Sequence, residues 1–294
     1  MKKWLLVIRA PFLVLPVVLA FLGTVVAWYD GYFHLGHALL AFFGLLLAHI
    51  SVNVFNEYFD YRSGVDFATR RTPFSGGSGA LPSGLIKPDQ ALWLAVGTLV
   101  AIIPIGIYFI TVKGWLLLPL LIVAALCIVL YTPFILKTWW PEWAPGAGLG
   151  ILPVLGAYFV QTGTYTLPAF IVSVPSGILV HNLLLLNEFP DVAADTKAGR
   201  RTMPIVMGER GASIVYSALT VSVYLWIIGW VIAGVMPLFT LIALLTLPLA
   251  LKAIQGALKY EDMSRLVPGM ANNVLFILTI QLLLGIGYIL AKVF

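Results

Sequence analysis

The chain alternates between long apolar stretches and short polar segments, and nine of the stretches are long enough to be membrane-spanning helices. A helix needs roughly 20 mainly apolar residues to cross the hydrocarbon core of a bilayer. The pattern therefore predicts an all-α polytopic membrane protein, with nine transmembrane helices in a bundle around a central cavity and a single domain over residues 1–294. The nine predicted spans are residues 11–28, 36–59, 88–111, 114–131, 146–163, 167–186, 212–235, 237–256 and 270–291.

The amino-acid composition agrees with this fold class. In this chain 61% of the residues are hydrophobic and 10% are charged, whereas a soluble domain carries about 25% charged residues. The abundance of aromatic side chains and the scarcity of charge exclude a disordered chain. The single cysteine, Cys127, has no partner within the chain, which excludes a disulfide-stabilised scaffold.

The basic residues predict the orientation, because cytoplasmic loops carry an excess of Lys and Arg. With a cytoplasmic N-terminus, all of the 17 Lys and Arg residues except Lys113 and Lys292 lie on the cytoplasmic side of the nine spans. We therefore interpret the net charge of +5 as a topology signal and expect no nucleic-acid partner. Lys2 and Lys3 before an apolar run are also typical of a cleavable signal peptide. Because Arg9 interrupts that run, we expect the first span to be retained.

Two short segments share one order of polar residues. Residues 56–60 read Asn-Glu-Tyr-Phe-Asp, and residues 187–191 read Asn-Glu-Phe-Pro-Asp. Each segment continues through another aspartate and a glycine to a pair of arginines, so we interpret 56–73 and 187–204 as a pseudo-repeat. Each copy begins at the cytoplasmic end of a predicted span, the second and the sixth. A pseudo-twofold axis along the membrane normal would therefore bring the two charged ends together.

The polar residues of the repeat predict a cation site. Asn56 and Asp60 are four residues apart and share a helix face, and the same holds for Asn187 and Asp191. Both faces are expected to point into the bundle, because an ionisable group that faces lipid costs at least about 2.5–3.5 kcal/mol. Facing carboxylate clusters repel each other unless a cation neutralises them, and Mg²⁺ favours carboxylate and phosphate oxygens.

Basic residues follow both acidic clusters and predict an anionic substrate. Lysine and arginine donate to phosphate oxygens, and arginine does so in bidentate geometry. The candidate donors are Arg70, Arg71, Lys197, Arg200 and Arg201. They indicate a diphosphate bound through magnesium, and the apolar bundle indicates a lipid chain as the rest of the substrate. His49 and Asn53 lie near the same polar stripe, and His181 is either a packed polar group or part of an acceptor pocket.

On these motifs the chain resembles the UbiA superfamily of intramembrane prenyltransferases. The signatures of that family are an Asn-x-x-x-Asp…Asp motif after the second helix and an Asp-x-x-x-Asp motif after the sixth. The matching residues, which are the candidate catalytic residues, are Asn56, Asp60, Asp66, Asn187, Asp191 and Asp195. The stretch from Tyr131 to Lys137 is also similar to a Tyr…Lys segment of the family, and the resemblance covers the whole chain.

The resemblance implies a prenyl transfer that depends on magnesium. The implied ligands of two Mg²⁺ ions are Asp60, Asp66, Asp191 and Asp195, with Asn56 and Asn187 assisting. Lys137 joins the donors to the polyprenyl diphosphate, and Tyr58 and Tyr131 join the candidates that line the cavity. The allylic C–O bond ionises, and an aromatic acceptor attacks the carbocation. The family also implies an integral protein of a prokaryotic plasma membrane, with the motif loops on the cytoplasmic side.

The spacing of the first motif points to one branch of the family. Asp60 and Asp66 are six positions apart, which is similar to the branch that uses 1,4-dihydroxy-2-naphthoate in menaquinone biosynthesis. Other acceptors (4-hydroxybenzoate or geranylgeranylglyceryl phosphate) and acceptor-free terpene cyclisation stay open. A transporter of a phosphorylated or cationic solute is the alternative of another class. The clustering of both motifs at one membrane face favours the enzyme.

Overall fold

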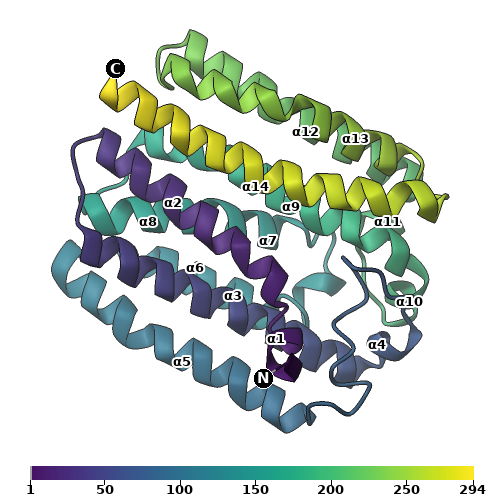
Figure 1. Cartoon of the computed structure of the whole chain (residues 1–294). Helices are drawn as coiled ribbons and strands as arrows, with labels where there is room; N and C mark the ends of the chain where they lie inside the picture. The colour runs from purple at the N-terminus through teal and green to yellow at the C-terminus, as the bar shows by residue number, and fades with distance from the viewer. Residues whose placement is uncertain (1) are drawn as a thin grey trace.

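The computed structural model describes residues 2–294, and within that range it contains helices, turns and loops but no strand (Figure 1). The α-helices are α1 (Lys2–Val7), α2 (Val14–Tyr29), α3 (Leu35–Ser63), α4 (Val65–Ala68), α5 (Pro88–Lys113), α6 (Leu117–Leu130), α7 (Trp143–Gly146), α8 (Leu152–Thr162), α9 (Leu167–Glu188), α10 (Val192–Lys197), α11 (Met203–Val206), α12 (Glu209–Ile232), α13 (Leu247–Leu258) and α14 (Met263–Val293). The 3₁₀ segments are η1 (Ala10–Leu13), η2 (Ile135–Lys137), η4 (Phe189–Asp191) and η5 (Leu238–Thr246), and η3 (Ala147–Ile151) is a π-helix.

The long helices run side by side as a bundle (Figure 1). Helices α3 and α5 pack together on one side, and α13 and α14 pack together on the other, with α2, α8 and α9 between them. The main core is built from apolar side chains of the central helices, such as Leu22 of α2, Leu179 of α9 and Phe276 of α14, none of which is exposed. This core holds α9, which carries the second motif, at the centre of the bundle.

Glycine allows α9 to approach the fifth predicted span closely. A Cβ atom added to Gly150 would lie 2.6 Å from the carbonyl oxygen of Ser176, and one added to Gly146 would lie 3.0 Å from that of Gly177. Small residues at helix contacts in membranes permit such backbone contact. The start of that span therefore fixes the position of α9.

Eight helical segments of the described chain are long and apolar enough to cross a membrane, which confirms the predicted all-α membrane fold. Helix α6 has 14 residues, so it is about 21 Å long at 1.5 Å per residue, and the hydrocarbon core is about 30 Å thick. The count of nine spans therefore stays a prediction, as does the cytoplasmic N-terminus. Helix α3 continues to Ser63, past the predicted end at residue 59, and it ends where Gly64 takes a left-handed φ of 82°.

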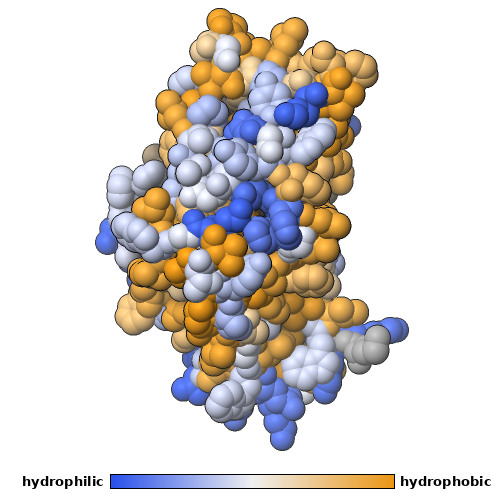
Figure 2. All heavy atoms as spheres, turned by 90° about the vertical axis from the view of Figure 1, so that its left-hand side faces the viewer, coloured by the Kyte–Doolittle hydropathy of each residue, from blue (hydrophilic) through white to orange (hydrophobic). Residues whose placement is uncertain are grey.

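The end of the bundle away from the motifs is shown in Figure 2, where hydrophilic residues gather in the middle, near the top and along the lower edge, with hydrophobic residues between them. Two helices that begin at the motif end, α5 and α14, carry a lysine in their last turn here. Lys113 Nζ donates to the carbonyl of Gln161 at 2.6 Å, and Lys292 Nζ donates to that of Tyr29 at 3.0 Å. These are the two basic residues that the charge pattern assigns to the opposite side from the motifs.

Candidate active site

The two motif segments meet at one end of the bundle, where α4 packs against α10 (Figure 1). Asp60 lies on the last turn of α3, and Asp66 lies in α4, after a turn at Gly64 with a left-handed φ of 82°. Asp191 ends η4, and Asp195 lies in α10. The short helices after α3 and α9 therefore bring the acidic residues of both segments into one region.

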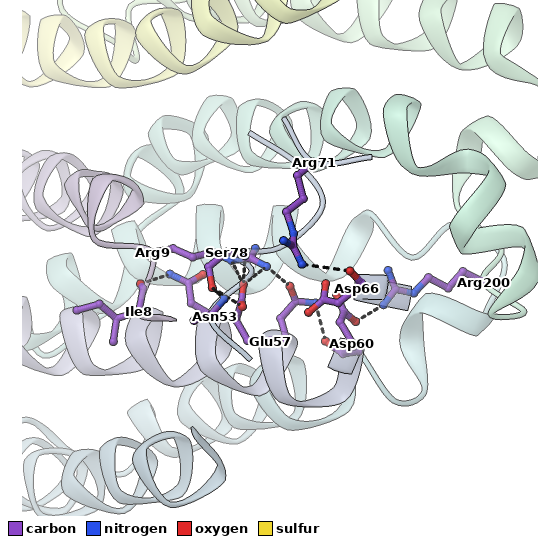
Figure 3. Close-up of polar contacts among 12 residues, drawn as sticks. Ile8, Arg9, Asn53, Glu57, Asp60, Asp66, Arg71, Ser78 and Arg200 are labelled. Atoms are coloured by element: carbon purple, nitrogen blue, oxygen red, sulfur yellow. Dashed lines mark hydrogen bonds and ion pairs between the residues drawn. The ribbon is translucent and has the colours of Figure 1, made fainter. Parts of the chain in front are cut away.

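Two side chains link the segments directly. The Thr69 hydroxyl donates a hydrogen bond to Asp191. Arg200 forms an ion pair with Asp195, from Nη1 to Oδ1 at 2.8 Å, and a second ion pair with Asp60 (Figure 3). Burial disfavours the charged guanidinium, but the carboxylates of Asp60 and Asp195 outweigh this effect and raise the pKa of Arg200. The first and second motifs are thus joined across one polar cluster.

Among the four motif aspartates, Asp66 is the one whose carboxylate receives neither an ion pair nor a side-chain hydrogen bond in the described chain. It is buried, and its Oδ2 atom has no hydrogen-bond partner. Burial, together with the negative charges of Asp60 and Glu57, raises the pKa of Asp66 to about 7. Arg71 Nη2 donates to the backbone carbonyl of Asp66 at 3.3 Å and makes no bond to the carboxylate. A buried carboxylate oxygen without a hydrogen-bond donor can instead be bound by a cation.

The glycine-rich segment 75–79 passes over Asp66. A Cβ atom added to Gly77 would lie 2.5 Å from Asp66 Oδ1, and Gly77 has a left-handed φ of 71°. Ser78 donates to Glu57 from its backbone N–H at 2.7 Å and from its hydroxyl at 2.6 Å. Glycine is therefore required at position 77 both by the backbone conformation and by the contact with Asp66.

The N-terminal segment contributes Arg9, which the motif analysis did not select. Its Nε donates to Glu57 Oε1 at 2.7 Å, and its Nη2 donates to Asn56 Oδ1 at 2.9 Å (Figure 3). Asn53 Nδ2 fixes the same segment by donating to the Ile8 carbonyl at 3.1 Å. Arg9 has a left-handed φ of 51°, which is uncommon outside glycine. The signal that could have found it is an arginine at the start of an apolar span, where a charge is costly.

The two glutamates of the repeat have different surroundings. Glu57 is paired with Arg9, whereas Glu188 is buried and neither of its carboxylate oxygens has a hydrogen-bond partner. The carboxyl group of Glu142 is also buried, and its Oε1 accepts a hydrogen bond from the Met203 N–H at 2.6 Å. The repeat is therefore not symmetric in charge, because a cation accompanies the glutamate of the first copy alone in the described chain.

The remaining basic candidates lie on the surface at the same end of the bundle. Their side chains are exposed and form no ion pair within residues 2–294, and they are Arg70, Arg71, Lys137, Lys197 and Arg201. The Arg201 N–H donates to the Leu136 carbonyl at 2.8 Å, which ties the segment that carries Lys137 to the second motif. These cations therefore surround the acidic cluster.

A pocket of about 110 Å³ lies between the two motif helices, and we name it the polar pocket for the polar side chains within its otherwise apolar lining. Its polar lining residues are Arg9, His49, Asn53, Asn56, Tyr131 and Asn187. The Asn187 Oδ1 atom is buried and has no hydrogen-bond partner. Asn56 Nδ2 donates to Thr132 at 3.2 Å, so the two motif asparagines differ in their bonding.

The polar pocket adjoins a larger apolar cavity of about 440 Å³ between α3, α5, α6 and α8. The residues that line both are His49, Ile128, Gly148 and Leu149. Tyr58 and His181 lie outside both cavities. Tyr58 packs against Phe59, and His181 accepts a hydrogen bond from Trp140 Nε1 at 2.9 Å, as a packed polar group does.

Comparison with known proteins gives the family. The model of the UbiA prenyltransferase family matches residues 14–283. The chain is 30% identical over 273 residues to 1,4-dihydroxy-2-naphthoate octaprenyltransferase of Bacillus subtilis (strain 168). The aligned region covers 92% of this chain and 86% of that protein. It is also 28% identical over 214 residues to digeranylgeranylglyceryl phosphate synthase of Thermococcus kodakarensis, and this aligned region covers 68% of each protein.

Among solved structures, a UbiA homolog from Archaeoglobus fulgidus bound to GPP and Mg²⁺ has the same fold. Its TM-score is 0.57 at 16% sequence identity, over 96% of this chain and 99% of that one. The chain belongs to the UbiA prenyltransferase family, as the resemblance of its motifs implies. It is a membrane-embedded prenyltransferase.

Proposed function

We propose that this protein transfers a prenyl group from a polyprenyl diphosphate to an aromatic quinone precursor, with 1,4-dihydroxy-2-naphthoate as the acceptor and Mg²⁺ as the cofactor. The observation that carries the proposal is an acidic cluster from both motifs beside a polar pocket that adjoins an apolar cavity. The similarity to the naphthoate prenyltransferase of Bacillus subtilis supports the choice of acceptor.

Magnesium suits the donor set at the acidic cluster. The Oδ2 atom of Asp66 and the Oδ1 atom of Asn187 are buried oxygens without hydrogen-bond partners, and Mg²⁺ takes oxygen ligands. In our proposal two ions would be held by Asp60, Asp66, Asp191 and Asp195, with Asn56 and Asn187 assisting. Bound there, magnesium would neutralise the charge that develops on the diphosphate as it leaves. The Mg²⁺ and GPP bound to the Archaeoglobus homolog support this assignment.

The basic residues around the cluster provide donors for the diphosphate. Their side chains are exposed, and no acidic partner engages them within residues 2–294. We assign this role to the exposed residues Arg70, Arg71, Lys137, Lys197 and Arg201 and also to Arg200, which is paired with Asp60 and Asp195. A cationic rim of this kind also attracts an anionic headgroup from the aqueous phase.

The apolar cavity suits the prenyl chain. Its lining is aliphatic and aromatic apart from His49, so it excludes water from a hydrocarbon substrate and from a carbocation. His49 stands where the two cavities meet, and its Nδ1 bonds to the Leu45 carbonyl at 2.9 Å. This bond assigns the hydrogen to Nδ1, because a carbonyl can only accept. The lone pair of His49 Nε2, which has no partner, is therefore available to accept a hydrogen bond from an acceptor hydroxyl.

The reaction follows from this arrangement. The allylic C–O bond breaks, and its electron pair leaves with the diphosphate, whose charge the surrounding cations stabilise. A ring carbon of the acceptor then donates an electron pair to the carbocation, and the acceptor loses a proton. The aromatic ring of Tyr131 lines the polar pocket and is placed to stabilise the cation.

A panel of acceptors tests the proposal. Detergent-purified protein is incubated with Mg²⁺, octaprenyl diphosphate and one acceptor at a time: 1,4-dihydroxy-2-naphthoate, 4-hydroxybenzoate, homogentisate or geranylgeranylglyceryl phosphate. We expect a prenylated product with the naphthoate. A product with another acceptor alone would refute the acceptor assignment, and a hydrocarbon or alcohol formed without any acceptor would indicate cyclisation. Solute uptake into proteoliposomes, with no prenylated product, would refute the proposed transfer.

A further inference from the structure

Arg200 contacts one carboxylate of each motif, Asp60 of the first (Figure 3) and Asp195 of the second, in the position where a bridging cation would be expected. Its Nη1 is 2.8 Å from Asp195 Oδ1, and its Nη2 contacts Asp60 Oδ1. The side chains of Asp60 and Asp195 are buried, with 8% and 3% exposed, and that of Arg200 is largely buried, with 11% exposed. One guanidinium therefore neutralises an acid from each copy of the repeat.

We propose that Arg200 is an internal counter-cation, which joins the two motifs in the metal-free protein and is displaced from Asp60 and Asp195 when Mg²⁺ binds. The inference rests on the proposed function, because it takes these aspartates as the metal ligands. Two buried carboxylates of like charge destabilise a site that has no positive charge between them. The Arg200 guanidinium supplies that charge from within the chain.

The guanidinium and the metal ion compete for the same atoms. Mg²⁺ binds carboxylate oxygens at about 2.0–2.1 Å, and the guanidinium of Arg200 contacts one carboxylate oxygen of each motif, Oδ1 of Asp60 and Oδ1 of Asp195. Within residues 2–294, no three His, Cys, Asp or Glu side chains converge closely enough to hold one ion in the conformation with Arg200 in place. Binding of a metal ion therefore requires the carboxylates to exchange the guanidinium for the ion.

The chain around Arg200 permits this exchange. Arg200 follows Gly199, which has a left-handed φ of 73° and no atom within 4 Å of an added Cβ. The next residue, Arg201, is exposed on the same segment. A guanidinium released from the aspartates can pair with the oxygens of an arriving diphosphate in bidentate geometry. Arg200 thus exchanges one pair of anions for another, so its charge stays compensated.

The test measures Mg²⁺ binding without any substrate. Wild-type protein and Arg200→Gln are purified in detergent, freed of divalent cations and titrated with MgCl₂ by calorimetry, and their melting temperatures are measured before and after the titration. Without metal, we expect Arg200→Gln to melt about 5 °C below the wild type. We also expect its Kd for Mg²⁺ to be about 10-fold lower, because the competitor has been removed. A variant that is merely damaged would bind Mg²⁺ more weakly, so an unchanged or raised Kd overturns the proposal.

Two further variants complete the experiment. Arg200→Lys keeps the charge but loses the fork that contacts two carboxylates at once, so its Kd should fall by about 3-fold. This variant carries the test if Arg200→Gln does not fold, and an unchanged Kd then overturns the proposal. Arg210→Gln removes the same charge from an exposed arginine that makes no ion pair in the described chain. This control variant should leave the melting temperature and the Kd for Mg²⁺ unchanged.

The failure of this inference can be distinguished from the failure of the proposed function. If wild-type protein binds no Mg²⁺ and forms no prenylated product, the proposed function fails and the inference fails with it. If wild-type protein binds Mg²⁺ and forms product, but Arg200→Gln does not bind Mg²⁺ more tightly, only the inference is wrong: Arg200 does not compete with Mg²⁺, and the proposed function is unaffected.

Discussion

Thr69, at the end of the first motif segment, donates its hydroxyl hydrogen to Asp191 of the second motif, across 122 positions of sequence. The bond joins the two copies of the repeat at the acidic cluster. It also explains how the carboxylate of Asp191 is held in one orientation when its own helix, η4, is a single 3₁₀ turn. The motifs are thus parts of one site, and each orients an acid of the other.

Replacing Thr69 tests this connection. We expect Thr69→Val to lower kcat about 10-fold, because a charge-assisted hydrogen bond contributes about 1.5–3 kcal/mol and the freed carboxylate can rotate away from its position. Thr69→Ser keeps the hydroxyl and should retain most of the activity. Steady-state kinetics of both variants give the comparison. Equal activity of Val and Ser variants would mean that the bond has no role in orienting Asp191.

The motif aspartates are expected to be required for turnover. Asp60→Ala and Asp191→Ala should each lower activity by at least about 100-fold, because each removes a proposed magnesium ligand and charge stabilisation of the leaving group is lost. Both proteins should still elute as folded species in detergent. Asp89→Ala, at an exposed site on the first turn of α5, is the matched control and should remain active. Near-wild-type activity of either motif variant would show that its aspartate is structural.

The repeat-related glutamates should respond differently to the same substitution. Glu57→Gln removes the charge that pairs with Arg9, so we expect a loss of about 2–3 kcal/mol of unfolding free energy. Glu188→Gln, which removes no cation pair, should cost less than about 1 kcal/mol. Thermal or denaturant unfolding in one detergent gives the order. The reverse order would contradict the assignment of Glu57 as a charged partner and Glu188 as an uncompensated carboxyl group.

Magnesium binding should depend on pH through Asp66. The pKa of this carboxyl is raised to about 7, so protons occupy it in the metal-free protein below that pH. A metal ion requires the charged form, and protons therefore compete with it. We expect the Kd for Mg²⁺ to rise about 10-fold from pH 8 to pH 6, because about a tenth of the sites are then ionised. Asp66→Asn should flatten this dependence, and an equally steep curve in that variant would assign the proton to another group.

His49 is expected to act on the acceptor and not on the diphosphate. His49 lines both cavities and its Nε2 has no hydrogen-bond partner, so we expect His49→Phe to remove one hydrogen bond to an acceptor hydroxyl. The KM for the acceptor should rise about 10-fold, in keeping with about 1.4 kcal/mol for a buried bond, while the Kd for Mg²⁺ stays unchanged. A change confined to the KM for the prenyl diphosphate would instead assign His49 to the donor substrate.

Much of the fold follows from the sequence, because a lipid solvent demands long apolar helices and restricts charge to few places. The position of Lys113 and Lys292 at the far end of the bundle agrees with the charge pattern. The short helix α6 is less predictable, since its apolar stretch continues beyond its helical part: Tyr131 is apolar enough for the stretch but begins a turn.

The sequence predicts those residues of the site that occur in both copies of the repeat, but it does not predict the residues that reach the site through a single contact. Duplicated spacing selects Asp60 and Asp191, but no periodicity shows that Arg9 reaches Asn56 or that Thr69 reaches Asp191. These contacts depend on how α1, α4 and α10 turn back over the ends of the long helices. Aromatic residues within the motifs are no guide either, as Tyr58 lies outside both cavities whereas Tyr131, the last residue of the predicted span 114–131, lines the polar pocket.

The central claim is Mg²⁺-dependent prenyl transfer to an aromatic ring, and the most direct measurement is the mass of the product. Purified protein is given octaprenyl diphosphate and 1,4-dihydroxy-2-naphthoate, with MgCl₂ in one sample and EDTA in the other, and the lipid extract is examined by mass spectrometry. We expect a prenylated naphthalenoid product and inorganic diphosphate with magnesium, and neither with EDTA. Intact substrates in both samples, from protein that is folded and binds magnesium, would contradict the proposed transfer to this acceptor.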